Sequence, residues 1–278
     1  MNNVCGWIAL AGQTSQRPTL KGLQKADWLI IGGGITGLSA AHALARMLPQ
    51  QRIVLLDRQR AAQGASARNS GFVVSHELPG ADELLGRPGH SAYQLACGIG
   101  IAAGEEVRRR IDELGIECEF DAGGYHFAVH QGQHLQDSGA RVATLNAAGA
   151  QAQYLEGAAL QQRLGSGFYQ RAIHCAGGNA LLQPAKYVKG LLERLPERVE
   201  VFENSPVQDL QPLPGRGWRA VTGEGEIQAP QVLACVGAFL PRLGVRHSRT
   251  FPLELSASIT RPPVSYTHLR AHETRHDL

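Results

Sequence analysis

The amino-acid sequence predicts a mixed α/β fold with an α+β portion. Two short apolar runs, at residues 28–31 and 53–57, lie on either side of a segment with helical spacing, which is the pattern of a parallel βαβ unit. Residues 117–130 predict two strands with no helix between them, as in an antiparallel sheet. We therefore expect a parallel sheet combined with a smaller antiparallel sheet.

The βαβ unit begins at Trp28. A continuous apolar run to Ile31 is followed by three glycines, and apolar residues then recur at helical spacing until Pro49 ends the helix. Residues 53–57 predict the second buried strand. Crossovers between parallel strands of this kind are right-handed.

The middle of the chain predicts a loop over residues 60–90, which are rich in small and polar residues. Helices are expected at about 93–114, 131–147 and 156–164, with the two strands of residues 117–130 between the first two helices. The first of these helices is expected to have one apolar side, made of Leu95, Ile99, Ala103, Val107, Ile111 and Leu114.

The last third returns to strands. Residues 171–184 predict strand and loop, and Pro184 is suited to the first turn of a helix that ends near Leu195. Strands are then expected at residues 199–203, 218–222 and 231–237. Because the tail has no periodicity, we interpret residues 263–278 as non-native.

Composition excludes several classes of protein. Of the 278 residues, 43% are hydrophobic, and the formal net charge of +3 is too small to indicate nucleic acid or an anionic membrane as a partner. No apolar run reaches the ~18 residues that an integral membrane segment needs. The cysteines are odd in number and form no C-x-x-C pair, which predicts reduced thiols, no metal site and a cytoplasmic location. They are Cys5, Cys97, Cys118, Cys175 and Cys235.

The strongest local motif is Gly32-x-Gly34-x-x-Gly37, placed between a strand and a helix. The first glycine allows a tight turn, the second lets the backbone approach a pyrophosphate, and the third lets the helix pack on the strand. The N-terminus of the following helix offers free N–H groups to phosphates. The motif predicts a Rossmann-like dinucleotide site.

Asp57 ends the next strand, 20 residues after Gly37. A carboxylate at this place can hydrogen-bond the hydroxyls of a ribose, and it disfavours the 2′-phosphate of NADP. The alternative is a solvated strand end beside a glycine turn. The motif by itself leaves NAD and FAD equally open.

A second element, residues 63–73, is a loop of small residues that carries Arg68 and Asn69. Small side chains let a backbone pass close to a ligand, and the guanidinium could pair with a phosphate. A flexible surface loop explains the same composition equally well.

With these motifs the chain resembles the FAD-dependent oxidoreductases of the D-amino acid oxidase and glycine oxidase superfamily, and within it the gamma-glutamylputrescine oxidase-like enzymes. Seven segments carry the resemblance in order: 17–22, 27–41, 54–57, 64–71, 104–124, 177–184 and 231–239. The resemblance implies FAD as cofactor and a Rossmann-like FAD-binding domain interleaved with a smaller antiparallel-sheet substrate domain.

The resemblance also implies the site residues. The pyrophosphate would be held by the glycine turn and helix start, the adenosine by Asp57, Arg58, Val207 and Gly237, and the stretch toward the flavin by the second element. In full, the cofactor-binding residues are expected to be Gly32, Gly33, Gly34, Ile35, Thr36, Gly37, Asp57, Arg58, Gly64, Ala65, Ser66, Arg68, Asn69, Ser70, Gly71, Val207 and Gly237.

Two departures from the family stand out. The second element has Ala67-Arg68-Asn69-Ser70-Gly71 where members commonly show Gly-Arg-Asn-Gly-Gly, and members are longer at the C-terminus. We therefore expect a C-terminally truncated chain with an incomplete substrate domain. The expected division is a leader (1–25), an FAD-binding domain (26–92 with 172–250), a substrate domain (93–171 with 251–262) and the tail (263–278).

The implied reaction is FAD-dependent oxidation of a C–N bond in an amine or amino acid. Hydride passes to the flavin, the imine hydrolyses, and oxygen or another acceptor reoxidises the flavin. The alternatives are a flavin-binding but catalytically incompetent fragment and a flavin monooxygenase. No catalytic side chain is assigned, although Tyr125 and His126 lie in the expected substrate sheet. The oligomeric state is left open.

Overall fold

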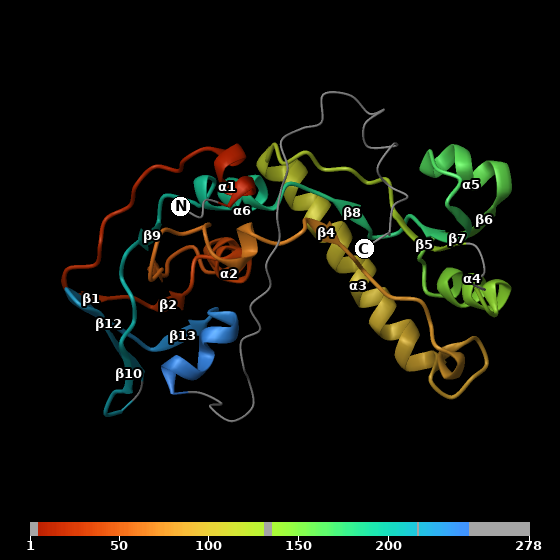
Figure 1. Cartoon of the computed structure of the whole chain (residues 1–278). Coiled ribbons are helices and arrows are strands. Elements are labelled where there is room, and N and C mark those ends of the chain that lie inside the picture. Colours follow the sequence, from red (N-terminus) through yellow and green to blue (C-terminus); the bar gives the residue numbers. More distant parts are fainter. Residues whose placement is uncertain (1–4, 131–134, 216, 245–278) are drawn as a thin grey trace, which may run out of the picture.

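The computed structural model describes residues 5–130, 135–215 and 217–244. The chain folds into two parts that the long helix α3 (His90–Leu114) connects (Figure 1). One part holds the parallel sheet, and the other holds a small antiparallel sheet at the far end of α3. The mixed α/β fold that the sequence predicts is therefore confirmed.

The parallel sheet has the strand order β13-β2-β3-β9, and every neighbouring pair in it is parallel. These strands span Gln231–Ala234, Trp28–Ile31, Ile53–Leu56 and Val199–Phe202. All four residues of β3 are buried, because this strand lies in the interior of the sheet and both of its faces are covered. The prediction for β2 is confirmed at both ends, and those for the other three strands to within three residues at their C-terminal ends.

Helices cover one face of the parallel sheet. Helix α2 (Ile35–Met47) is the crossover between β2 and β3, and α6 (Pro184–Glu193) packs beside it over residues such as Ile30 and Leu55. Pro184 stands in the first turn of α6, and the side chain of Gln183 caps the helix by accepting a hydrogen bond from the backbone N–H of Lys186. Helix α1 (Gly6–Ala11), which the sequence analysis does not predict, packs on α6.

A second sheet, with the order β1-β12-β11-β10, covers the other face. Only β11 (Trp218–Val221) matches a strand predicted from the sequence; the others are β1 (Gly22–Lys25), β12 (Gly225–Ala229) and β10 (Asp209–Pro212). Ala220 and Ile227 of this sheet are fully buried against Leu29 and Leu56 of the parallel sheet. The strands missing from the prediction are short and partly polar, so pairing and packing decide their conformation rather than periodicity.

The small sheet has the antiparallel order β5-β7-β6, with strands Tyr125–His130, Tyr169–Cys175 and Ala152–Glu156. Helices α4 (Ser138–Ala147) and α5 (Gly157–Leu164) pack against it. One prediction is wrong here: residues 117–130 form one strand rather than two. Residues 117–120 form no strand, and Asp121 makes only an isolated bridge to Leu181.

The apolar side expected on α3 is also corrected. Its C-terminal half packs as predicted, with Ile111 buried in the core beneath α2 and α6. Leu95 and Ile99 are instead 67% and 62% exposed, and Ala103 is exposed as well. The other buried residues of α3 are Cys97 in its first half and Gly104 just past its middle, because the small sheet and the 177–179 loop approach a different side of the helix.

The segment of residues 60–90 is largely irregular, as predicted, with a single turn of 3-10 helix at Ala65–Ala67, another at Ala81–Glu83 and the strand β4 (Phe72–Val73). Strand β4 pairs with β8 (Ala180–Leu181) between the two parts of the fold. Strand β7 crosses the domain boundary expected at residue 172, and the division into domains stays a prediction. The tail, residues 263–278, lies outside the described residues.

None of the helices within the described ranges combines the length and apolar character that a membrane crossing requires. The five cysteines, all in the described part, are free thiols, and burial raises the pKa of Cys118 to about 11 and of Cys175 to about 12.

Candidate cofactor-binding site

The glycine turn lies where the C-terminal end of β2 meets the start of α2. Gly32 has φ +110°, and a Cβ atom there would lie 2.4 Å from the carbonyl oxygen of Cys235 beyond β13. A Cβ atom at Gly37 would lie 1.9 Å from the carbonyl oxygen of Gly32. Both positions therefore require glycine, one for the turn and one for the close approach of the helix to the strand.

Asp57 holds the glycine turn from the neighbouring strand. One carboxylate oxygen accepts a hydrogen bond from the backbone N–H of Gly33 (2.8 Å), and the other accepts one from the backbone N–H of Gln59 (2.8 Å). Burial raises the pKa of Asp57, and these two hydrogen bonds oppose the shift. Asp57 thus stands at the carboxyl end of the parallel sheet, where open α/β sheets bind their ligands.

The second element folds back onto the start of α2. The Ser66 hydroxyl accepts a hydrogen bond from the backbone N–H of Ile35 (3.0 Å), and it would lie 2.8 Å from a Cβ atom at Gly34. Ser66 therefore brings a hydroxyl to the end of the helix where N–H groups face outward. Thr36 is exposed at the same end.

The rest of the second element is held mainly by its own contacts. Arg68 Nε donates to the carbonyl of Gln63 (2.9 Å), and Asn69 bonds the backbone of Ser66 and of Gly71. Arg68 and Asn69 are exposed, as are the remaining predicted residues of this loop, Gly64, Ala65 and Ser70. Gly71 is buried, because a Cβ atom there would lie 2.1 Å from the carbonyl oxygen of Leu182.

The predicted adenosine residues meet at the ends of β3, β9 and β13. The guanidinium of Arg58 lies 4.2 Å from the ring centroid of Phe239, two residues after Gly237. Ser205, two residues before the half-buried Val207, donates its backbone N–H to the carbonyl of Asp57 (2.8 Å). The structure thus brings the glycine turn, Asp57 and these segments to one edge of the sheet, while their contact with a cofactor stays a prediction.

Glu203 is a structural residue of this site that sequence reasoning does not identify. Its side chain is 1% exposed and accepts hydrogen bonds from the backbone N–H groups of Arg17 (3.2 Å) and Ala61 (3.1 Å). Arg60 Nε lies 3.7 Å from the same carboxylate. Glu203 therefore ties the leader to the segment that follows Asp57. The only signal in the sequence was a glutamate directly after an apolar strand, since its burial and its partners depend on segments far away in the chain.

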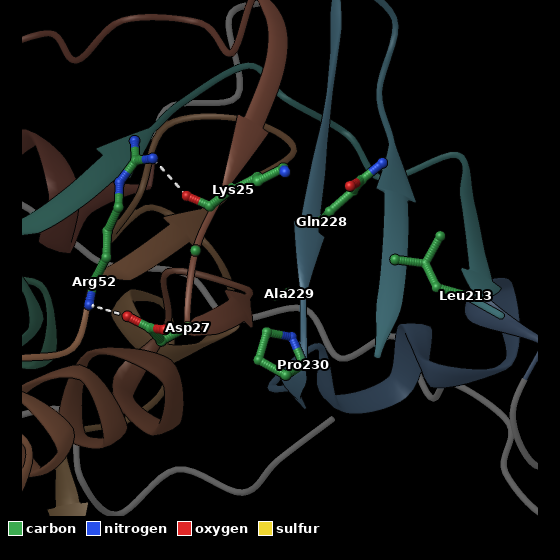
Figure 2. Close-up of a pocket in the computed structure, with 8 residues that line it drawn as sticks. Lys25, Asp27, Arg52, Leu213, Gln228, Ala229 and Pro230 are labelled. Carbon is green, nitrogen blue, oxygen red and sulfur yellow. Dashed lines mark hydrogen bonds between the residues drawn. The ribbon is translucent and has the colours of Figure 1, made fainter. Parts of the chain in front are cut away.

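A surface pocket of about 460 Å³ lies at the opposite, N-terminal edge of β2 and β3. Figure 2 shows Asp27 and Arg52 on one side of it and Leu213 and Gln228 on the other. Arg52 is neutralised there by Glu200 (2.6 Å), and its backbone N–H is bound by Asp27 (2.7 Å). None of the predicted cofactor residues lines this pocket, and ligands of open α/β sheets bind at the other edge.

Comparison with known proteins supports the same assignment. A model of the DAO family, described as FAD dependent oxidoreductase, matches residues 27–276. The chain is 27% identical over 201 residues to a probable oxidoreductase, OrdL, of Haemophilus influenzae, covering 71% of this chain and 46% of that protein. It is 25% identical over 236 residues to the gamma-glutamylputrescine oxidoreductase of Escherichia coli, covering 84% and 54%. The chain thus spans about half the length of the curated relatives it matches.

A solved structure shows the same fold. The L-amino acid deaminase of Proteus myxofaciens, solved in complex with anthranilate, superposes with a TM-score of 0.67 over 85% of this chain and 51% of that one, at 16% identity. The expected family, the Rossmann-like fold and the FAD dependence of that family are confirmed. Since the family match runs through the glycine turn, Asp57 and the second element, this chain belongs to the FAD-dependent oxidoreductases of the DAO family.

Proposed function

We propose that this chain binds FAD at the carboxyl edge of its parallel sheet and takes part in oxidising the C–N bond of an amine or amino acid. The observation that carries the proposal is that three features contact one another at that edge. The carboxylate of Asp57 bonds the glycine turn at Gly33, and the hydroxyl of Ser66 bonds the start of α2 at Ile35. The substrate class is supported by relatives named for gamma-glutamylputrescine and for L-amino acids.

The residues present fit an adenine dinucleotide. The helix start, with Thr36 exposed, offers N–H groups and a partial positive charge to a pyrophosphate. The hydroxyl of Ser66 accepts one hydrogen bond from the backbone N–H of Ile35, so its own proton is available to donate to a phosphate oxygen. Asp57 is half-buried and keeps further lone pairs for ribose hydroxyls beyond the two backbone bonds it already accepts.

The protein's part in the reaction is to bind, orient and exclude water. When bound, FAD supplies the acceptor for the two electrons and the hydrogen that leave the substrate carbon. The turn at Gly32–Gly37 and the second element hold the cofactor, and the small sheet of β5, β6 and β7 lies across from them along α3 and forms part of the substrate side. We also propose that the chain is cytoplasmic, on the strength of its reduced thiols.

The absorption spectrum of the purified chain tests the cofactor. We expect flavin bands at ~450 and ~375 nm, with FAD released on denaturation. Anaerobic addition of gamma-glutamylputrescine or an L-amino acid then distinguishes an oxidoreductase, whose 450 nm band bleaches, from a flavin-binding chain without turnover, whose band persists. A chain that stays colourless and cannot be reconstituted with FAD would refute the proposal.

Replacing Asp57 with alanine is expected to raise the dissociation constant of FAD by ~10- to 100-fold, since a hydrogen bond to a charged group is worth about 1.5–3 kcal/mol. Titration of the apo chain with FAD, followed by flavin fluorescence, measures the change. Asp27→Ala is the matched control, because Asp27 also binds a backbone N–H (Arg52, 2.7 Å) but at the opposite edge of the sheet. Equal losses of affinity in the two variants would contradict the assignment of Asp57.

A further inference from the structure

His76 is a buried imidazole with an unsatisfied nitrogen. The residue is 8% exposed, and its Nε2 atom, which is inaccessible to solvent, has no hydrogen-bond partner in the part of the chain that the structure describes. A buried polar atom without a partner costs free energy that folding has to offset. An unpaired buried atom in a native structure calls for an explanation, and a bound ligand is one source of the missing partner.

The other ring nitrogen of His76 is held by Ser75. The hydroxyl oxygen of Ser75 lies 2.7 Å from Nδ1, and the same hydroxyl can donate to the carbonyl of Gly177 (3.1 Å) or to Asn179 Oδ1 (3.0 Å). With the hydroxyl proton given to either acceptor, Ser75 accepts from an Nδ1–H. In this tautomer Nε2 carries a lone pair and can accept a proton.

The backbone beneath His76 is fixed by close contacts that only glycine allows. A Cβ atom at Gly100 of α3 would lie 1.8 Å from the carbonyl oxygen of Ser75, and one at Gly104 would lie 2.0 Å from that of Gly178. The backbone N–H of Ser75 also donates to Asn179 Oδ1 (2.9 Å). The imidazole is therefore built into a rigid junction of α3, the 75–76 segment and the 177–179 loop.

His76 lies where the cofactor loop reaches the substrate sheet. Strand β4 begins directly after Gly71, the end of the second element, and His76 follows three residues after β4 ends. Its ring centroid is 6.3 Å from that of Phe127 on β5. Flavin and substrate have to meet for the reaction, and His76 stands on the segment that connects the predicted cofactor loop with the small sheet.

Neutral groups surround the imidazole on the elements packed near it. Burial lowers the pKa of His76, and no charged side chain contributes to the shift. The titratable residues of the apolar cluster that contains Phe127 are Tyr93 and Cys97 of α3, Tyr154 of β6 and Cys175 of β7, and burial raises the pKa of all four. His76 lies beside this cluster, and its lowered pKa leaves the imidazole neutral and able to accept a proton at neutral pH.

We propose that Nε2 of His76 accepts a proton from the ammonium group of the bound substrate and leaves the neutral amine from which a hydride can depart. One N–H bond of the ammonium breaks, a bond from that proton to Nε2 forms, and the electron pair stays on the amine nitrogen; nothing is oxidised in this step. The inference rests on the proposed amine or amino-acid oxidation at the same site.

The test compares His76→Leu with the unaltered chain in two measurements. The first is chemical unfolding of the chain without substrate across pH 5–8. Because the folded pKa of His76 lies below its ordinary 6.5, the unfolded state binds more protons and the stability of the unaltered chain falls as pH drops below 6.5. His76→Leu removes both this slope and the unsatisfied atom, so it is expected to be at least as stable, with an advantage that grows below pH 6.5.

The second measurement is the rate at which the 450 nm band of the FAD-loaded chain bleaches with gamma-glutamylputrescine or L-phenylalanine under anaerobic conditions. We expect His76→Leu to bind FAD normally and bleach ~10²- to 10⁴-fold more slowly, and to lose the decline in rate that the unaltered chain shows below pH 6.5. Ser75→Ala keeps that decline but shifts it in pH. His90→Leu, which replaces a half-buried imidazole at the start of α3, is the control with unchanged rate.

The outcomes separate the two proposals. Normal FAD binding with an unchanged bleaching rate in His76→Leu overturns the role of His76 alone, and so does a clear loss of stability, which would make the imidazole a packing residue. Failure of the unaltered chain to hold FAD, or to bleach with either amine, overturns the proposed function and the role of His76 together.

Discussion

Replacing Gly37 with alanine is expected to destabilise the fold by about 3 kcal/mol, at the upper end of the cost of overpacking, and to abolish FAD binding. The added Cβ atom would lie 1.9 Å from the carbonyl oxygen of Gly32 and 3.2 Å from the side chain of Ile30. The nearest obstacle is backbone, so helix α2 has to move away from β2. The movement displaces the helix N-terminus that would receive the pyrophosphate.

Gly98→Ala in α3 is the matched control for this substitution. No atom lies within 4 Å of a Cβ atom there, and the helix interior favours alanine over glycine by up to about 1 kcal/mol. Chemical denaturation gives the stability of each variant, and flavin absorbance gives the bound cofactor. If Gly37→Ala were as stable as Gly98→Ala and held FAD, the close packing of α2 on β2 would not be a requirement of the site.

Replacing Glu203 with alanine is expected to lower the free energy of unfolding by about 3–5 kcal/mol, the cost of breaking a buried ion pair. The substitution leaves the N–H groups of Arg17 and Ala61 without this acceptor and removes the carboxylate that faces Arg60. The loss releases the leader from the segment that follows Asp57. The midpoint of urea unfolding is the measurement.

Glu200→Ala provides the contrast, because Glu200 lies in β9 and Glu203 directly follows that strand. Glu200 pairs with Arg52, but the two side chains are 42% and 38% exposed, so the expected cost is about 1 kcal/mol or less. Glu203→Gln keeps the shape while removing the charge and should fall between the two alanine variants. Similar losses for Glu200→Ala and Glu203→Ala would contradict the structural role assigned to Glu203.

The parallel βαβ unit could be predicted because its signals are local. Within thirty residues the sequence contains both apolar runs, at 28–31 and 53–57, and the glycine turn between strand and helix. The structure has the strands and the helix there, with ends shifted by at most one residue. Short strands such as Asp209–Pro212 could not be predicted, because their sequence is polar and their conformation comes from pairing with β11.

The sequence by itself determined the family, the glycine turn and the acidic end of the second strand, since these depend on residue types at fixed spacing. Only the tertiary structure decided which side of α3 is covered, why Glu203 is buried and where His76 stands. Leu95 and Ile99 keep helical spacing with Ile111 but are exposed, because covering depends on elements distant in the chain. The unsatisfied nitrogen of His76 likewise depends on residues that are distant in the chain, so no local sequence pattern could predict it.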